Sequence, residues 1–266
     1  MQLTDSYQAS LPAELLERYR FAEVRNAAAI LSTVAPSCRS DLDEVLSGFQ
    51  LSAAHLLDPG GNKSEVAREL DLAFRERGWR ETGLVIDIAG TLTSHSWGSD
   101  EAHVLTTQFA GETHKIDNFR DQVAVEVEWN AKDGNLDRDL AAFRAMYDAG
   151  FLDAAVVITR HHASIKHAAN YLARRFGLVK ATERFNTSTT TNLERLTWRL
   201  GRGDAGGCPV LAVAISQQTY TAGLVSRPSG LDHGIEQPDI PVLDREAERM
   251  LEAETIGVQL DLFGDG

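Results

Sequence analysis

One run of eight residues, DAAVVITR at 153–160, constrains the fold of this chain most strongly. It is mostly apolar and lies between two stretches whose apolar residues have helical spacing. A strand that is covered on both faces reads as a near-continuous apolar run, so this segment predicts a buried central strand. The run PVLAVAIS at 209–216 has the same character. We therefore expect a sheet with helices packed against it.

The rest of the chain completes an α/β pattern. Apolar residues recur at helical spacing in the N-terminal third, and Asn62 or Ser64 can cap a helix that ends near Arg77. The expected helices cover 12–35, 40–57, about 64–77, 137–149, 164–176, a segment ending near 200 and one near 243–254. The expected strands cover 83–90, 112–119, 122–129, 153–160 and 209–216. A loop is expected at 93–100. This order predicts a mixed β-sheet flanked by helices. We expect one domain over 1–266, with a catalytic core at about 80–220 and an acidic extension at about 230–266.

Net charge argues mildly against a nucleic-acid partner. The chain carries −13 at pH 7, with a pI near 5.0, whereas DNA-binding surfaces use Lys and Arg to neutralise phosphates. The charge is not uniform, because the stretch 160–202 is rich in Lys and Arg and has only Glu183 and Glu194 as acids. A net-acidic chain can therefore still present a basic face.

Cysteine usage and the N-terminal segment favour a reducing compartment. Cys38 and Cys208 are far apart and have no metal-ligand spacing, so neither a disulfide framework nor a cysteine zinc site is expected. The N-terminus lacks leader features, and no run approaches the roughly 18 apolar residues of a membrane span. We expect a cytoplasmic protein with no membrane partner.

Two glutamates on one strand are the strongest chemical signal. Residues 122–129 alternate strictly, so that Glu126 and Glu128 share one face and the valines and Trp129 share the other. Like charges two residues apart repel, and a divalent cation removes that repulsion. The simpler alternative is that both glutamates line the solvent face of an edge strand.

A third carboxylate can reach the same position. Asp117 precedes Glu126 by nine residues and lies near the end of the preceding strand. If the two strands pair as an antiparallel hairpin, Asp117, Glu126 and Glu128 converge. Carboxylate oxygens are the ligands that Mg²⁺ prefers, with water and substrate phosphate completing its coordination.

Three strings around these carboxylates resemble a known family. They are HKIDNF at 114–119, VAVEVEWNAKD at 123–133 and LDRDL at 136–140. Together they resemble the BglII and BamHI group of type II restriction endonucleases in the PD-(D/E)XK superfamily. The resemblance implies the restriction-endonuclease-like PD-(D/E)XK fold, with a central mixed sheet flanked by helices.

The resemblance also implies an activity and the residues that perform it. Asp117, Glu126 and Glu128 would be catalytic, and Mg²⁺, or Mn²⁺ as a substitute, would be held by Asp117, Glu126 and the carbonyl of Val127. Glu128 stands where most of the superfamily has lysine, and would either orient or deprotonate the attacking water. A homodimer would hydrolyse double-stranded DNA at a short palindrome, with a GATC-centred site implied, and leave 5′-phosphate ends. A cognate DNA methyltransferase is expected in the same system but not as a bound subunit. The alternatives are a nonspecific or repair-type nuclease of this fold and an inactive DNA-binding domain.

Other polar residues have less specific signals. Glu65 or Glu69 would supply an auxiliary acid from a helix ahead of the catalytic strands, although a surface glutamate on an amphipathic helix has the same pattern. His161 and His162 are expected at the surface or near DNA.

Two segments are candidates for reading DNA. Asn130, Lys132 and Asp133 follow the catalytic strand directly, where members of the group make base contacts, although these residues also suit an ordinary turn. The second segment combines hydroxyl and amide side chains with a nearby arginine before a helix, and its simpler explanation is that Thr190 or Asn192 caps that helix. Its candidate residues are Arg184, Asn186, Thr187, Ser188, Thr189, Thr190 and Asn192.

Overall fold

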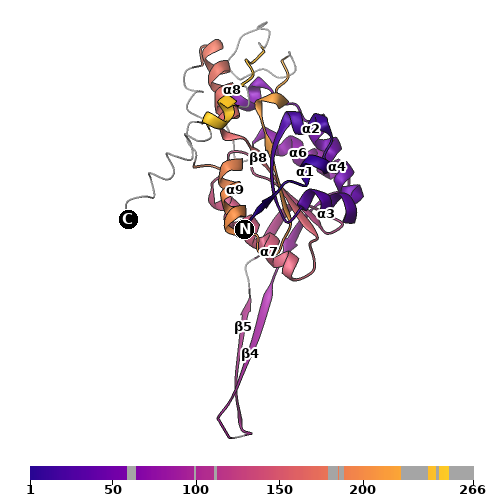
Figure 1. Cartoon of the computed structure of the whole chain (residues 1–266), viewed down its shortest axis with the longest axis vertical. Coiled ribbons are helices and arrows are strands. Elements are labelled where there is room, and N and C mark those ends of the chain that lie inside the picture. The colour runs from indigo at the N-terminus through magenta and orange to yellow at the C-terminus, as the bar shows by residue number, and fades with distance from the viewer. Residues whose placement is uncertain are drawn as a thin grey trace, which may run out of the picture.

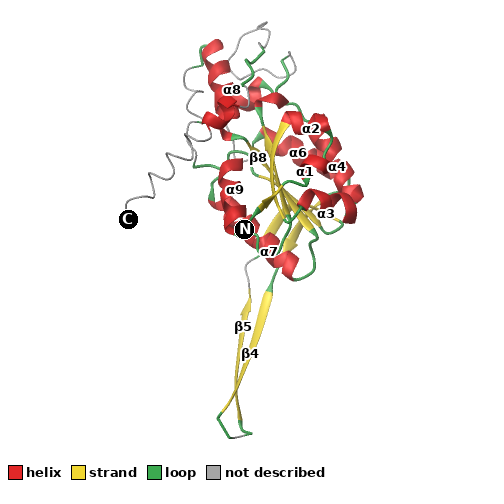
Figure 2. Cartoon of the chain, in the orientation of Figure 1, coloured by secondary structure: helices red, strands yellow, loops and turns green. Residues whose placement is uncertain are grey.

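The computed structural model describes residues 1–58, 64–98, 100–110, 113–178, 185, 189–222, 239–243 and 246–251. It has a body built on a seven-stranded sheet, and a two-stranded arm that projects far from that body (Figures 1 and 2). Helices cover both faces of the large sheet, which confirms the predicted α/β architecture. No helix in these ranges is long and apolar enough to cross a membrane.

The large sheet is mixed, with the order β1-β2-β9-β8-β7-β6-β3. Strands β7, β8 and β9 run parallel, and the other neighbours are antiparallel. The two apolar runs of the sequence form β8 and β9, and every residue of both strands is buried, as predicted. The strands are β1 (Leu3–Thr4), β2 (Tyr19–Val24), β3 (Arg80–Leu84), β6 (His114–Arg120), β7 (Val123–Val127), β8 (Ala154–Arg160) and β9 (Val210–Ile215).

The helices form two layers around two apolar clusters. On one face, α7 (Gly134–Asp148) and α9 (Leu193–Arg202) supply the apolar residues that pack on the sheet. The other face is covered by α2 (Ala13–Arg18), α3 (Ala27–Val34), α4 (Pro36–Gly48), α5 (Ala53–Leu57), α6 (Glu65–Glu76) and α8 (His162–Arg175), with α1 (Tyr7–Ser10) and the short 3₁₀ helix η2 (Gln217–Thr219) beside them. Ser64 caps α6 as predicted, because its hydroxyl accepts the Ala67 N–H at 3.1 Å.

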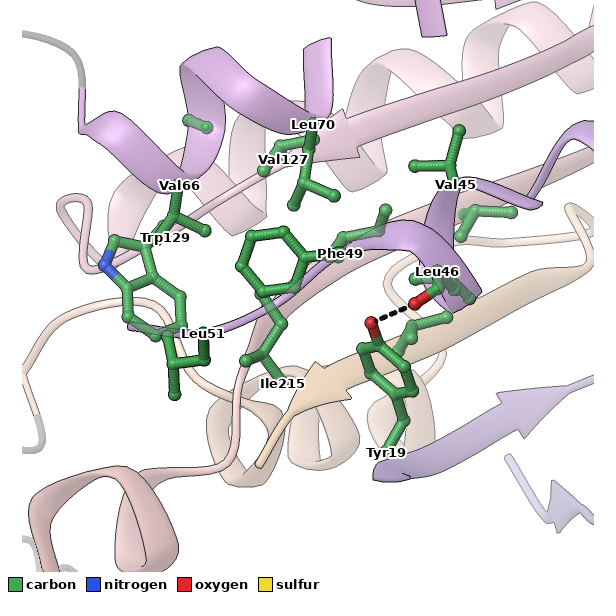
Figure 3. Close-up of a cluster of buried hydrophobic side chains, with 14 of the residues drawn as sticks. Tyr19, Val45, Leu46, Phe49, Leu51, Val66, Leu70, Val127, Trp129 and Ile215 are labelled. Carbon is green, nitrogen blue, oxygen red and sulfur yellow. Dashed lines mark hydrogen bonds between the residues drawn. The ribbon is translucent and has the colours of Figure 1, made fainter. Parts of the chain in front are cut away.

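The apolar side of β7 anchors this strand in the core. Figure 3 shows Val127 and Trp129 close to Val66 and Leu70 of α6, and all four are buried. Each such side chain contributes about 1.5–3 kcal/mol when it is fully buried. Because side chains alternate along a strand, this packing turns residues 124, 126 and 128 toward the face that α7 covers.

The predicted helix over 12–35 is wrong in its middle. Tyr19–Val24 form β2, which pairs along its whole length with β9, nearly two hundred residues away. The helical spacing is real on both sides, in α2 and α3, and Arg25 and Asn26, both at positive φ, form the turn from β2 into α3. The long-range pairing therefore overrides the local pattern.

The arm is the second departure from the predicted elements. Strands β4 (Asp87–His95) and β5 (Ala102–Ala110) form nine antiparallel pairs, whereas the sequence predicted one strand at 83–90, a loop at 93–100 and no strand at 102–110. Nearly every arm residue is exposed. Ile88 pairs with Phe109 and Leu92 with Leu105, so one face carries an exposed apolar stripe. These strands bury nothing in the body, which is why the core pattern did not reveal them.

We expect the body to fold without the arm. Replacing residues 87–110 by a short Gly-Ser turn should shift the midpoint of thermal unfolding by less than about 3 °C, because surface changes usually alter stability by at most about 0.5 kcal/mol. In contrast, Phe74→Ala should cost about 3–5 kcal/mol, because Phe74 is fully buried against Trp79. Circular dichroism during heating measures both. An arm deletion as damaging as Phe74→Ala would show that the arm stabilises the body.

Candidate active site

Glu126 and Glu128 lie inside the molecule. Strand β7 is an interior strand between β6 and β8, and the two glutamates are only 3% and 6% exposed. They therefore do not form the solvent face of an edge strand, which was the simpler alternative. Two buried acids on the same side of one strand require a chemical reason.

Asp117 joins them through the predicted hairpin. Strands β6 and β7 pair antiparallel, with Asn118 opposite Val125. The backbone N–H of Asp117 donates to Glu126 Oε1 at 3.3 Å. The nine-residue spacing thus places Asp117 directly beside Glu126.

Glu128 is held from several directions. Asn135 Nδ2 donates to both of its carboxylate oxygens at 3.2 Å, and Arg138 lies 3.9 Å from Oε1. Its backbone carbonyl accepts the hydroxyls of Thr159 at 2.9 Å and Thr191 at 2.8 Å. The end of β7 is therefore fixed in position while the carboxylate faces α7.

Asp139 is a fourth acid at this site, and the sequence interpretation missed it. It lies on α7, is 2% exposed and pairs with Arg138 at 3.1 Å. Its carboxyl group is within hydrogen-bonding reach of that of Glu128. The sequence indicated this burial. Leu136 lies three residues before Asp139 and Phe143 lies four residues after it, so both share its helix face, and both are buried.

Burial and mutual repulsion raise the pKa values of these acids. The pKa of Glu126 lies well above 4.5, first because of burial and then because of the charges of Asp139 and Asp117. Burial and Asp139 raise the pKa of Glu128 to about 8. Burial also raises the pKa of Asp139, against the opposing effect of Arg138. The site therefore favours either protons or a cation among its oxygens.

The donor set suits a hard divalent cation. Carboxylate and carbonyl oxygens are the ligands that Mg²⁺ selects, and burying them together is unfavourable without a counter-charge. Within the described ranges, no three His, Cys, Asp or Glu side chains already surround one point. A bound ion would thus complete its coordination with the Val127 carbonyl, water and substrate phosphate, as Mg²⁺ usually does.

The two candidate auxiliary acids make other contacts. Glu69 pairs with His55 Nε2 at 3.0 Å, and Glu65 pairs with Arg68 on the surface of α6. Neither set of contacts includes Asp117, Glu126 or Glu128. An acid that a helix does place beside Glu128 is Asp139 of α7, which follows β7 in the sequence.

The two segments expected to read DNA come together in space. Lys132 and Thr190 form an antiparallel bridge, and the Thr190 hydroxyl donates to Asn130 Oδ1 at 2.8 Å. Asn192 caps α9, since its Oδ1 accepts the Arg195 N–H at 2.9 Å, as the simpler alternative held. Thr189 is exposed. The other candidates, Arg184, Asn186, Thr187 and Ser188, lie outside the described residues.

Charged residues behind this loop are already paired. Asp133 Oδ2 accepts from Arg195 and Arg199, each at 2.8 Å. The expectation that His161 and His162 are at the surface is wrong, because they are 0% and 2% exposed at the junction of β8 and α8. Burial and the neighbouring Arg160 lower the pKa of His162 to about 3.

The fold and the site together define the class of protein. A mixed sheet flanked by helices, with acids on two adjacent strands, is the restriction-endonuclease-like arrangement. The model of the family "Restriction endonuclease BglII/BglIII" matches residues 19–215, well over half of the chain. The chain belongs to this family, and is a type II site-specific deoxyribonuclease that acts on double-stranded DNA. Such enzymes generally use a divalent metal ion. No curated protein matches the chain.

The raised pKa of Glu128 predicts how the metal-free protein responds to pH. An acid with a raised folded-state pKa binds more protons in the folded chain than in the unfolded chain between its two pKa values. For Glu128 that window runs from 4.5 to about 8, so the free energy of unfolding falls as the pH rises through it. The slope for one such group approaches about 1.4 kcal/mol per pH unit.

Glu128→Gln should make the fall of the free energy of unfolding with pH less steep, because the amide does not titrate. Urea denaturation in EDTA at pH 5, 6, 7 and 8 measures it. Glu14→Gln is the matched control, since the side chain of Glu14 is 66% exposed and its loss should leave the profile unchanged. A profile equally steep in Glu128→Gln and in the unmodified protein would contradict the assignment.

Proposed function

We propose that this chain is a Mg²⁺-dependent type II restriction endonuclease that cuts at a short palindrome through Asp117, Glu126 and Glu128. The observation that carries the proposal is the burial of Glu126 and Glu128 on one side of an interior strand, with Asp117 beside them. Acids in this setting are unfavourable unless they bind a cation. A divalent cation can also activate water and stabilise the charge that develops in phosphodiester hydrolysis.

Asp117, Glu126 and the Val127 carbonyl are the residues that we assign to the metal, with Mn²⁺ able to replace Mg²⁺. When bound, such an ion polarises the phosphodiester and lowers the pKa of a bound water. The protein's part is to hold these oxygens in place before DNA arrives. The packing of Val127 and Trp129 in the core provides that rigidity.

Glu128 is the residue that we assign to the attacking water. A carboxyl with a pKa near neutral is suited to accept a proton, and the pKa of Glu128 is about 8 in the metal-free chain. A nearby cation would lower it and keep the carboxylate ionised. Asn135 orients the carboxylate, and the hydroxyls of Thr159 and Thr191 hold its backbone.

DNA reading is assigned to the loop after β7 and to the segment against it. Asn130 and Lys132 lie beside the active-site strand and are bridged to Thr190. Amide side chains suit adenine edges, whereas lysine suits guanine or phosphate. Arg184, Asn186, Thr187, Ser188 and Thr189 remain candidates for the same surface.

The proposed active form is a homodimer. A palindrome presents two identical half-sites, which a two-fold dimer reads with one subunit each. By family likeness, we propose a GATC-centred site, products with 5′-phosphate ends, and protection of the host by a separate methyltransferase.

Digestion of unmethylated phage DNA tests the activity. We expect discrete fragments with Mg²⁺ and none with Ca²⁺ in its place. A smear would indicate a nonspecific or repair-type nuclease, and binding without cleavage would indicate an inactive domain.

The variant Glu126→Gln tests the metal assignment. It should reduce the rate of cleavage by at least about 100-fold, which is more than the loss of a group that only supports a metal ligand, while DNA binding in a gel-shift assay persists. Glu14→Gln should cut normally.

Glu128→Lys separates the two roles open to Glu128. Lysine occupies this position in most of the superfamily and can orient water, but it cannot reproduce the proton-accepting carboxylate of a glutamate. Retained cleavage, within about tenfold, would mean that the residue only orients the water. Loss of cleavage with retained metal binding would assign the proton transfer to the carboxylate. Rates of plasmid nicking in Mg²⁺ distinguish these outcomes.

A further inference from the structure

Asp139 has no role in the reaction proposed above, yet its side chain is buried beside Glu128, one of the residues assigned to that reaction. Its side chain is 3% exposed on α7, and Arg138 contacts its Oδ1. No donor in the described part of the chain reaches its Oδ2, which is fully enclosed. An enclosed carboxylate oxygen without a nitrogen or hydroxyl donor costs about 1–3 kcal/mol or more, so it needs either the proton of the neighbouring Glu128 carboxyl or a cation.

The neighbours of Asp139 indicate the charge of that partner. The carboxyl groups of Asp139 and Glu128 are within hydrogen-bonding reach, and the charge of Asp139 also acts on Glu126. Arg138 is the guanidinium that pairs with this group, and its own side chain is 55% exposed. When the four acids Asp117, Glu126, Glu128 and Asp139 are ionised, the one guanidinium leaves an excess of three negative charges. A divalent cation offsets most of that excess.

Helix α7 is placed to present such a ligand. Leu136, Leu140 and Phe143 are fully buried, so the helix cannot rotate without opening the core. The same helix supplies Asn135, which binds Glu128. Asp139 lies in the middle of α7, where it cannot serve as a helix cap.

We propose that Asp139 adds a ligand from α7 to the divalent cation that Asp117 and Glu126 hold. This inference rests on the proposed function, because it concerns the same ion. It assigns a residue to that ion which the sequence interpretation did not include.

Cation binding to Asp139→Asn tests the proposal without any cleavage assay. Asparagine keeps the shape but removes the charge, and Asp148→Asn is the matched control on the same helix, since the Asp148 side chain is 59% exposed. Isothermal titration with Mn²⁺ and with Ca²⁺ should show at least about tenfold weaker binding for Asp139→Asn only. Asp139→Ser provides a second variant if the first does not fold.

Thermal unfolding adds a signature that a purely structural role would not give. Without metal, Asp139→Asn should unfold at a higher temperature than the unmodified protein, because a repelled buried charge is gone. In saturating Ca²⁺ the order should reverse, because the variant gains less from the ion. Lower stability under both conditions, with unchanged ion affinity, would overturn the proposal.

The two proposals fail in different ways. If the unmodified protein binds neither Mn²⁺ nor Ca²⁺, then the metal-dependent function itself is wrong. If the unmodified protein and Asp139→Asn bind both ions equally, then only the assignment of Asp139 is wrong.

Discussion

Repulsion among buried carboxylates is the interaction on which this molecule's arrangement depends. Glu126, Glu128 and Asp139 are each at most 6% exposed, although like charges in a low-dielectric interior favour separation or solvent. Their positions are held by features that do not involve the charges. Strand β7 lies between two neighbours, and Val127 and Trp129 lock its opposite side into the core. The sheet thus provides the rigidity that holds the acids proposed to bind the metal ion and act on water.

The loop after β7 extends this framework toward the segments that we propose to read DNA. Thr191 links the two, because its hydroxyl binds the Glu128 carbonyl and accepts the Ala131 N–H. Behind them, the fully buried Arg160 donates to Thr190. A shift of the loop after β7 would therefore be transmitted to the backbone of Glu128, the residue that we assign to the attacking water. Such a connection is one physical route by which recognition of a site can be coupled to cutting it.

The parts of the fold that could be predicted are those in which one short segment carries its own evidence. The buried runs became β8 and β9, and alternation oriented Glu126 and Glu128 correctly. The spacing to Asp117 held because a hairpin is local.

The remainder depended on distant partners or on solvent. Strand β2 exists because β9 pairs with it, and the strands of the arm have no buried face to mark them. His161 has a polar sequence context but lies inside a junction of two elements. Asp139 was missed because its string was interpreted as a family motif and as part of a helix, and not as a source of a site residue, although its buried neighbours at helical spacing placed it inside. Helix periodicity, applied to acids as well as to apolar residues, would have found it.

The composition of the arm determines which proteases can reach it. Trypsin cuts after Lys and Arg, and the sequence has neither between Arg80 and Lys115. The arm is therefore closed to that enzyme. Proteases that cut after large apolar side chains meet Leu92, Leu105 and Phe109, all more than half exposed, and the fully exposed Trp97. Limited digestion with trypsin alone would make the arm look like part of the compact body, whereas a chymotrypsin-like protease would reveal it as an open ribbon.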